Sequence, residues 1–306
     1  MFCSNEEKLN VIVNLLRKSK RILFITGAGI SADSGLPTYR GVGGLYNRGR
    51  TEEGYTIEEC LSGSMFQRQP EITWKYMFQL GIAVAEHQPN DAHRIIAEWE
   101  KRLNSIGGKV VVVTQNIDNY HRAAGSRNVY EFHGSLRTLY CTACSWSEEL
   151  ETDKTALTRF KELQKTLLPC CPECHAVIRP RVVLFEESLP FHEIEQFQYE
   201  FNNGKGFDLV FSIGTSAMFP YITNPVRMAA LQKIPTIEIN PVESDLSYYV
   251  EIHLPMRAAE ALLEIEKQWN KKLSAEISQI NADIKIAPNR GHSQNSDGFY
   301  FNPSDQ

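Results

Sequence analysis

The sequence predicts an α/β protein: a parallel sheet with helices on both faces, plus a small zinc-binding domain formed by insertions. Four short apolar runs are predicted to be buried strands: 21–26, 109–114, 208–213 and 235–239. Continuously apolar strands separated by long connections are typical of parallel sheets buried between helices. Three segments have the apolar spacing of helices and are predicted to cover the sheet: 5–19, 91–103 and 256–271.

The composition is that of a globular protein, with 42% hydrophobic and 23% charged residues among 306. A net charge of −5 argues against direct nucleic-acid binding, which needs a basic face. No apolar run approaches the roughly 18 residues of a membrane span, and the first ten residues lack the pattern of a secretory signal. We therefore expect a cytoplasmic protein with no membrane partner, whose seven cysteines are thiols or metal ligands.

Two segments interrupt the alternation of strands and helices, and we expect them to build the small domain. Residues 46–90 are predicted to be a helical insertion, and residues 140–178 contain five of the seven cysteines. The large, Rossmann-like domain is then discontinuous and consists of residues 1–45, 91–139 and 179–283. Residues 284–306 are polar and contain Gly, Pro, Asn and Ser, so we expect a flexible tail.

A glycine-rich turn follows the first predicted strand, at the edge where open parallel sheets bind ligands. The turn reads Gly27-Ala28-Gly29-Ile30-Ser31-Ala32, and glycines in this pattern let backbone N–H groups approach a pyrophosphate. A tight turn without a ligand is the alternative. An ordinary dehydrogenase would have a second strand ending in an acid about 20 residues on, but here Glu52 and Glu53 follow a loop. A dinucleotide would therefore be held differently, with Arg40 of that loop in reach of a phosphate.

Small or polar residues also follow the other three predicted strands. They are Gln115-Asn116-Ile117-Asp118 after the second, Gly214-Thr215-Ser216 after the third and Asn240-Pro241 after the fourth. Each group alone could be a plain turn. Four strand ends of this kind meeting at one edge of a sheet favour a nucleotide site.

Two Cys-x-x-Cys pairs predict a metal site. Cys141 with Cys144 and Cys171 with Cys174 can present four thiolates tetrahedrally to zinc, and a closed shell of four sulfurs makes that zinc structural. Cys170 is an alternative to Cys171, although the sequence Cys-Pro-Glu-Cys favours Cys171. A redox pair is the other alternative, and the presence of two pairs argues against it.

His133 is the candidate general base. It lies between the polar cluster at 115–118 and the first cysteine pair, so we expect it to face the cleft between the domains. A neutral imidazole there can accept a proton near pH 7. A histidine with a purely structural role is the alternative.

Taken together and in order, these motifs resemble those of sirtuins, the NAD-dependent protein-lysine deacylases. The chain is closest to the bacterial-type branch that includes desuccinylating sirtuins, and the match covers roughly residues 10–265. The matching elements are 27–31, 34–40, 114–118, 132–135, the two cysteine pairs, 179–183, 214–216 and Asn240.

The resemblance implies an activity and a set of site residues. The acyl oxygen of an acylated lysine attacks the ribose carbon of NAD as nicotinamide leaves. His133 then takes a proton from the ribose hydroxyls, and water releases free lysine and O-acyl-ADP-ribose. Catalytic roles fall to His133, Asn116 and Asp118. NAD would be held by Gly27, Ala28, Gly29, Ser31, Tyr39, Arg40, Gln115, Asn116, Asp118, Gly214, Thr215, Ser216 and Asn240.

The resemblance also implies where acylated proteins or peptides bind. The segment containing Val183, Phe185 and Glu186 would pair with the substrate backbone. Its Glu186 stands where the family usually has Gly, which would either favour basic peptides or hinder docking. Met77 and Leu80 match the Tyr and Arg that hold a succinyl group, so we expect an apolar pocket for acetyl or longer acyl chains. The alternative is that both are core residues.

Two other functions remain open on the sequence. One is mono-ADP-ribosyl transfer to a protein, as some relatives of the family perform. The other is an NAD-binding or silencing module without turnover. His133 favours deacylation over the first, and the intact Gln115–Asp118 cluster argues against the second.

Overall fold

The computed structural model describes residues 4–38, 49–203 and 206–286. Within this part of the chain, the main sheet is parallel and has the strand order β3-β2-β1-β7-β8-β9. Its strands are β1 (Arg21–Thr26), β2 (Lys109–Thr114), β3 (Val129–Glu131), β7 (Leu209–Ile213), β8 (Thr236–Ile239) and β9 (Ile252–Leu254). The strand order reverses between β1 and β7, which is where open α/β sheets form ligand-binding crevices.

The predicted parallel sheet and its four inner strands are confirmed. The edge strands β3 and β9 have three residues each and were not predicted, because so short a run carries no periodic signal. His253 lies inside β9, where the strand pairs with β8. Its ring nitrogen Nε2 contacts the backbone oxygen of Asn240 at 3.0 Å.

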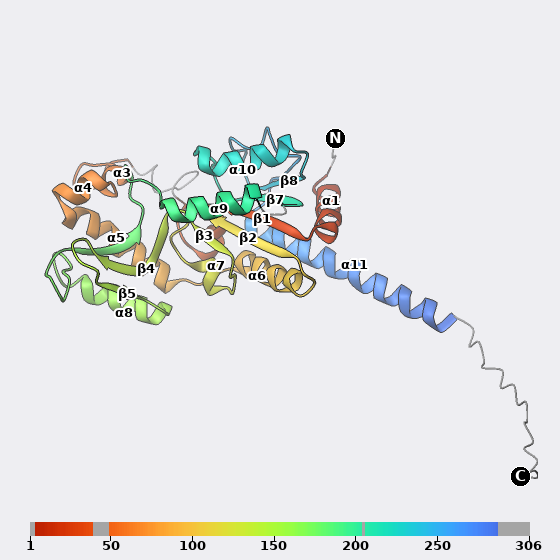
Figure 1. The fold of residues 1–306 in the computed structure, drawn as a ribbon, viewed down its shortest axis with the longest axis horizontal. Helices are drawn as coiled ribbons and strands as arrows, with labels where there is room; N and C mark the ends of the chain where they lie inside the picture. Colours follow the sequence, from red (N-terminus) through yellow and green to blue (C-terminus); the bar gives the residue numbers. More distant parts are fainter. Residues whose placement is uncertain (1–3, 39–48, 204–205, 287–306) are drawn as a thin grey trace, which may run out of the picture. The chain divides into compact units, whose positions relative to one another are not determined.

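Helices cover both faces of this sheet. Leu23, Val111 and Val210 pack against Phe197 of α9 (Phe191–Asn203) and Val226 of α10 (Pro220–Leu231). On the opposite face, Phe24 packs against Trp99 of α6 (Asp91–Asn104), with ring centroids 6.0 Å apart. Figure 1 shows α9 and α10 on one side of the strands and α6 on the other. Alternate residues of each strand therefore face different helical layers.

The first helix is α1 (Asn5–Lys18), and its start is set by its own sequence. The Ser4 hydroxyl accepts a hydrogen bond from the backbone of Glu7, and the Glu7 carboxylate accepts one from the backbone of Ser4. This reciprocal capping box satisfies two donors that a helix leaves unpaired. The helix buries Leu9, Ile12, Val13 and Leu16.

A second, three-stranded antiparallel sheet has the order β5-β4-β6 in the described residues. It consists of β4 (Gly134–Cys141), β5 (Ser147–Glu149) and β6 (Ile178–Val182). The helices α3 (Ile57–Cys60), α4 (Gly63–Arg68), α5 (Pro70–Glu86) and α8 (Asp153–Leu163) belong to the same region. The indole N–H of Trp74 in α5 donates to the backbone oxygen of Ile178 at 2.9 Å. At Gly81, a Cβ would lie 2.6 Å from the ring of Phe160, so only glycine lets α5 and α8 approach this closely.

The last helix, α11 (Ala258–Ile286), is longer than the predicted segment 256–271. Contacts divide the chain into two compact units, residues 1–268 and 269–306. Ala261, Leu262 and Ile265 are buried in the first unit. The tail expected at 284–306 begins within the helix, and residues 287–306 lie outside the described residues. In the described part of the chain, no helix has the length and apolarity needed to cross a membrane.

Candidate functional site

The turns that follow β1 and β7 touch each other. The backbone N–H of Gly29, in α2 (Ala28–Ser31), donates to the carbonyl oxygen of Gly214 at 2.7 Å, and that of Gly27 donates to Ile213 at 3.1 Å. A Cβ at Gly29 would lie 2.6 Å from the Cα of Gly214. The two glycines that were expected to offer their N–H groups to a pyrophosphate use them inside the protein. Glycine is required here because two backbones approach closely.

Three polar side chains form a buried cluster beside these turns. The Ser31 hydroxyl donates to Oδ2 of Asp118 at 2.7 Å, and the Asn116 amide donates to the Ser31 oxygen at 3.1 Å. All three side chains are buried. Burial raises the pKa of Asp118, and hydrogen bonds from the Tyr120 backbone and from Ser31 oppose that rise. The cluster is a fixed arrangement of donors and acceptors inside the protein.

A pocket of about 450 Å³, including its open mouth, adjoins the cluster. Ser31, Asn116 and Asp118 make one part of its wall polar. The rest is mostly apolar and consists of Ala28, Leu36, Pro37, Leu80, Ala83, Val84, Ile117 and Leu136. Of the two expected acyl-pocket residues, Leu80 lines this pocket, whereas Met77 is buried in the core of the second region.

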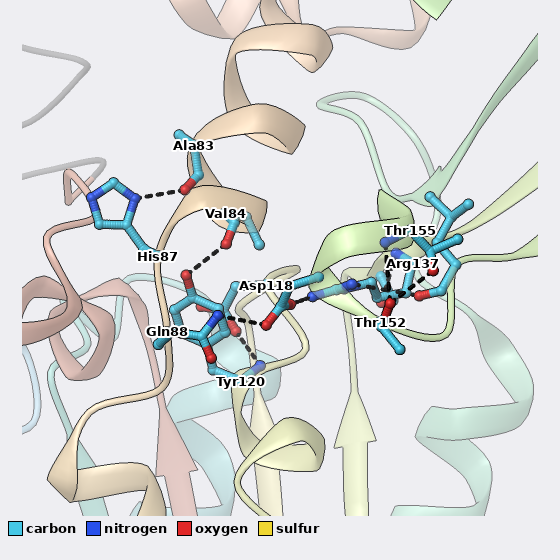
Figure 2. A network of polar contacts seen from close by, with 12 residues as sticks. Ala83, Val84, His87, Gln88, Asp118, Tyr120, Arg137, Thr152 and Thr155 are labelled. Carbon is cyan, nitrogen blue, oxygen red and sulfur yellow. Dashed lines mark hydrogen bonds and ion pairs between the residues drawn. The ribbon is translucent and has the colours of Figure 1, made fainter. Parts of the chain in front are cut away.

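Tyr120 connects the cluster to the pocket's other wall. Its backbone N–H donates to Oδ1 of Asp118 at 2.9 Å, and its hydroxyl donates to the backbone oxygen of Val84 at 2.9 Å. Figure 2 shows this link between α7 (Tyr120–Ala123) and α5. Nearby, Arg137 of β4 and Gln88 both bind the carboxylate of Asp153 at the start of α8. The Tyr120 contacts hold α5 beside the segment that follows β2, and the Asp153 contacts hold the start of α8 against β4 and the end of α5.

A pair of buried histidines lies next to the polar cluster. His93 of α6 and His121 of α7 have ring centroids 4.9 Å apart. Nε2 of His121 contacts the hydroxyl of Thr26 at 3.0 Å, and Nε2 of His93 is 3.5 Å from the Ser31 oxygen. Burial lowers the pKa of His121 to about 3 and also lowers the pKa of His93. Both rings are therefore neutral at pH 7. No pattern in the sequence links the two histidines, because they are 28 residues apart on different helices.

Thr215 joins three of the predicted strand ends. Its hydroxyl accepts a hydrogen bond from the Gln115 side chain at 2.8 Å, and its backbone oxygen accepts one from the Asn240 side chain at 3.1 Å. The backbone N–H of Ala217 also donates to the Thr215 hydroxyl, at 3.0 Å. Ser216 is exposed. The residues after β2, β7 and β8 are thus brought together, as the sheet topology predicted.

His133 lies between β3 and β4, and its ring is close to a tyrosine. Nε2 of His133 contacts the hydroxyl of Tyr221 in α10 at 2.7 Å. Burial lowers the pKa of His133, and a backbone hydrogen bond at Gln115 opposes that shift. The sequence analysis missed Tyr221. The only available signal was an aromatic residue after Pro220, close to the predicted Gly214-Thr215-Ser216 turn.

Of the four residues considered after the glycine-rich turn, the structure describes Glu52 and Glu53. Tyr39 and Arg40 lie outside the described residues. Glu52 and Glu53 bind the Lys75 ammonium of α5 at 2.9 and 2.5 Å, and Glu53 also accepts a hydrogen bond from Tyr76 at 2.7 Å. The two acids are therefore engaged with α5.

The segment after β6 runs beside His133 and beside the region of α4. Val183 donates its backbone N–H to the carbonyl oxygen of His133 at 2.9 Å, and Phe185 donates to Leu61 at 3.0 Å. Glu186 has a φ of 71°, a left-handed conformation that favours glycine. Its carboxylate accepts a hydrogen bond from the Ser64 backbone at 3.2 Å, in the first turn of α4. This cap explains how glutamate is accommodated at that backbone conformation.

The two cysteine pairs come together as predicted. The sulfurs of Cys141, Cys144, Cys171 and Cys174 all lie within 4.8 Å of one another. Cys170 is exposed and outside this cluster, so the choice of Cys171 is confirmed. Four sulfurs at Zn–S distances of roughly 2.3 Å are about 3.8 Å apart in a tetrahedron, and two of the sulfur pairs here are separated by 3.4 and 3.6 Å. The donor set and its spacing fit zinc.

Backbone N–H groups support two of these sulfurs. The N–H of Ala143 points at the sulfur of Cys141 at 3.3 Å, and that of Glu173 points at the sulfur of Cys171 at 3.4 Å. Each is two residues after its cysteine, which is the geometry of a tight knuckle. Such N–H groups stabilise thiolate charge before a metal shares it.

The fold and this site define a class of protein: a Rossmann-like sheet, a mostly apolar pocket with one polar wall beyond the carboxyl ends of β1 and β2, and a four-cysteine module. The chain matches the model of the Sir2 family over residues 27–219 and belongs to that family.

Its relatives include the "NAD-dependent protein deacylase 2" of Pseudomonas syringae pv. tomato, which is 46% identical over 252 residues, covering 82% of this chain and 96% of the relative. The protein of the same name from Pseudomonas aeruginosa is 45% identical, over 83% of this chain and 94% of its own.

Solved structures agree with this placement. A Sir2 homologue in complex with NAD aligns with a TM-score of 0.71 at 34% identity, over 86% of this chain and 94% of that one. A Sir2 protein with a deacetylated p53 peptide and 3′-O-acetyl-ADP-ribose aligns with a TM-score of 0.71 at 25% identity, over 85% and 98%.

Proposed function

We propose that this protein is an NAD-dependent protein-lysine deacylase, which produces nicotinamide, O-acyl-ADP-ribose and the free lysine. The observation that carries the proposal is the buried cluster of Ser31, Asn116 and Asp118, which makes one wall of a pocket beyond the carboxyl ends of β1 and β2. Membership of the Sir2 family and the names of the relatives support the same activity.

The residues around the pocket fit NAD. The wall formed by Asn116, Asp118 and Ser31 offers donors and acceptors to a carboxamide, and the apolar wall suits the flat face of a nicotinamide ring. NAD supplies the ribose carbon from which nicotinamide departs. The remaining proposed contacts are Gly27, Ala28, Gly29, Gln115, Gly214, Thr215, Ser216 and Asn240, together with Tyr39 and Arg40. Because Gly27 and Gly29 use their own N–H groups, we assign them to shaping the turn.

His133 is the proposed base. Its side chain is half-buried, and desolvation lowers its pKa, so the ring is neutral at pH 7. A neutral imidazole can take the proton of a ribose hydroxyl, which makes that oxygen a better nucleophile. Asn116 and Asp118 would orient the nicotinamide end of NAD. Burial in a largely apolar pocket also limits the access of water to the reacting carbon.

The proposed substrates are proteins or peptides that carry an acylated lysine. Relatives of this chain have been solved with p53 peptides, which supports this class of substrate. Val183, Phe185 and Glu186 would line the peptide's path. Leu80 would give the acyl group an apolar contact, with Met77 in the core behind the pocket, so we propose acetyl or longer chains, not succinyl. An overall charge of −5 is also compatible with protein substrates.

We assign zinc a structural role, because four thiolates leave no open coordination position. The proposed division is a large domain of residues 1–45, 91–139 and 179–283 and a small domain of 46–90 and 140–178. Cysteines that are not paired in disulfides are typical of cytosolic proteins, so a cytoplasmic location belongs to the proposal.

The test is incubation of the full chain with NAD and peptides that carry acetyl, succinyl or long-chain acyl lysines. We expect mass spectrometry to detect O-acyl-ADP-ribose with acetyl or long-chain peptides and little with succinyl peptide. Attachment of labelled ADP-ribose to protein, with no peptide turned over, would identify a mono-ADP-ribosyltransferase and refute the proposal. Binding of NAD without either product would do the same.

A further inference from the structure

We infer that Tyr221 is a positioning residue for His133, whose hydroxyl holds the imidazole ring with Nε2 as a hydrogen-bond acceptor. The inference rests on the proposed role of His133 as the base and adds a residue that this role requires. It starts from the contact of 2.7 Å between the Tyr221 hydroxyl and Nε2 of His133.

The tyrosine ring is held by its neighbours. Tyr221 lies in the first turn of α10, directly after Pro220. Its ring stacks on Phe219 with centroids 5.4 Å apart and an interplanar angle of 12°, and it packs against Phe132 at 6.2 Å. It meets the His133 ring edge-on, at 5.9 Å and 76°. Because these neighbours restrict the ring, the hydroxyl has a defined position opposite Nε2.

Hydrogen bonding on the other side of the imidazole sets the direction of this contact. A neutral imidazole carries one N–H and one lone pair. A backbone hydrogen bond at Gln115 opposes the lowering of the His133 pKa, which is the effect of an acceptor that faces a ring N–H. We assign the ring's N–H to that side, which leaves the lone pair of Nε2 for the Tyr221 hydroxyl at 2.7 Å. Burial raises the pKa of the Tyr221 hydroxyl to about 12, so it keeps its proton and donates.

The lone pair that Tyr221 occupies is the one a base must use. A substrate hydroxyl that gives its proton to Nε2 approaches the same atom, so the Tyr221 hydroxyl is the group that it replaces. Until then the tyrosine fixes both the tautomer and the rotation of the imidazole ring. Departure of nicotinamide precedes this proton transfer in the proposed reaction. Loss of the Tyr221 hydroxyl should therefore affect the later step and leave the earlier one unchanged.

The first test is spectroscopic and does not depend on turnover. The full chain, labelled with ¹⁵N-histidine, is compared with Tyr221→Phe, and the His133 signals are assigned from their loss in His133→Ala. We expect wild-type His133 to be neutral with the proton on Nδ1 and a hydrogen-bonded Nε2. In Tyr221→Phe, the Nε2 signal should shift toward that of an unbonded nitrogen. An unchanged Nε2 signal would overturn the inference.

Tyr130→Phe is the matched control. Tyr130 is a half-buried tyrosine of β3 that packs edge-on against Phe197, on the same side of the sheet. This variant removes a tyrosine hydroxyl from a ring that is linked to His133 only through Phe197, Phe132 and Tyr221. Its His133 signals should match those of the wild type, and a shift as large as that of Tyr221→Phe would count against a specific contact.

The second test separates the two steps of the reaction. Exchange of labelled nicotinamide into NAD reports the first step, and formation of O-acyl-ADP-ribose reports the second. For Tyr221→Phe we expect kcat for product formation to fall about fivefold, as for loss of one hydrogen bond, with exchange within about twofold of wild type. A parallel loss of both would indicate a structural role and overturn the inference. If the wild type forms no O-acyl-ADP-ribose, the proposed function fails, while the ¹⁵N signals still report on the contact itself.

Discussion

The backbone N–H of Gly29 donates a hydrogen bond of 2.7 Å to the carbonyl oxygen of Gly214 and so joins the turn after β1 to the turn after β7. The sheet reverses its strand order between these two strands. The contact therefore holds these two turns together at the point where the strand order reverses. Ser31, two residues after Gly29, reaches Asp118 from the same turn.

Gly29→Ala should lower the free energy of unfolding even when NAD is absent. The added Cβ would lie 2.6 Å from the Cα of Gly214, so the two turns would have to separate. We expect a loss of about 1 to 3 kcal/mol, as for other overpacked sites, measured by urea unfolding. In the control Gly107→Ala the Cβ meets nothing within 4 Å, and its φ of +74° is the only source of cost, about 1 kcal/mol. An unchanged stability of Gly29→Ala, with only weaker NAD binding, would contradict this reasoning.

Cys171→Ser should remove zinc from the purified protein, whereas Cys170→Ser should not. The sulfur of Cys171 belongs to the four-sulfur cluster, and its neighbour Cys170 is exposed outside it. Metal analysis should give about one zinc per chain for the wild type and for Cys170→Ser, as four thiolates per ion require. A strong chelator should lower the melting temperature of both. Zinc content near zero in the wild type would refute the site.

The free energy of unfolding should fall as the pH is lowered from about 6.5, the ordinary pKa of histidine. His93 and His121 are buried and neutral, with pKa values below this, so the unfolded chain takes up protons that the folded chain does not. The loss is at most about 1.4 kcal/mol per pH unit for each histidine, and for His121 it continues down to its pKa of about 3.

His121→Asn should make this dependence shallower, and the exposed His192→Asn should leave it unchanged. Urea unfolding at several pH values between 5 and 7 measures the slope. Equal slopes for the wild type and His121→Asn would show that the buried ring is not the source.

Glu186→Gly should weaken the preference for peptides with Lys or Arg beside the acylated lysine. The Glu186 side chain is exposed, and it caps α4 through the backbone of Ser64. An exposed charge pair contributes about 0.2 to 1 kcal/mol, so KM for a basic peptide should rise up to about fivefold, with little change for a neutral peptide. If KM falls for both peptides, the carboxylate hinders docking, and the expectation is wrong.

Local patterns predicted much of the fold and part of the site. The runs at 21–26 and 109–114 became the central strands, because continuous apolar residues mark buried parallel strands wherever their neighbours lie. The zinc ligands could be predicted for a similar reason, since the spacing Cys-x-x-Cys brings the two sulfurs of each pair close together in space. The three-residue strand β3 and the length of α11 depend on tertiary packing and on contacts that a short window does not contain.

Contacts between segments that are far apart in the chain could not be predicted from the sequence. Tyr221 is 88 residues from His133, and no pattern in the sequence links them. Nothing in the sequence distinguishes His93 and His121 from the other histidines, and their burial is seen only in the structure. The requirement for Gly29 was predicted, but its physical cause, the close approach to Gly214, appeared only in three dimensions.

The most direct test of the account follows nicotinamide exchange and O-acyl-ADP-ribose formation in His133→Ala, with the wild type beside it. The half-buried, neutral imidazole is the proposed base for the second step only. We therefore expect exchange to persist and the formation of O-acyl-ADP-ribose to be abolished. Full deacylation by His133→Ala would contradict it.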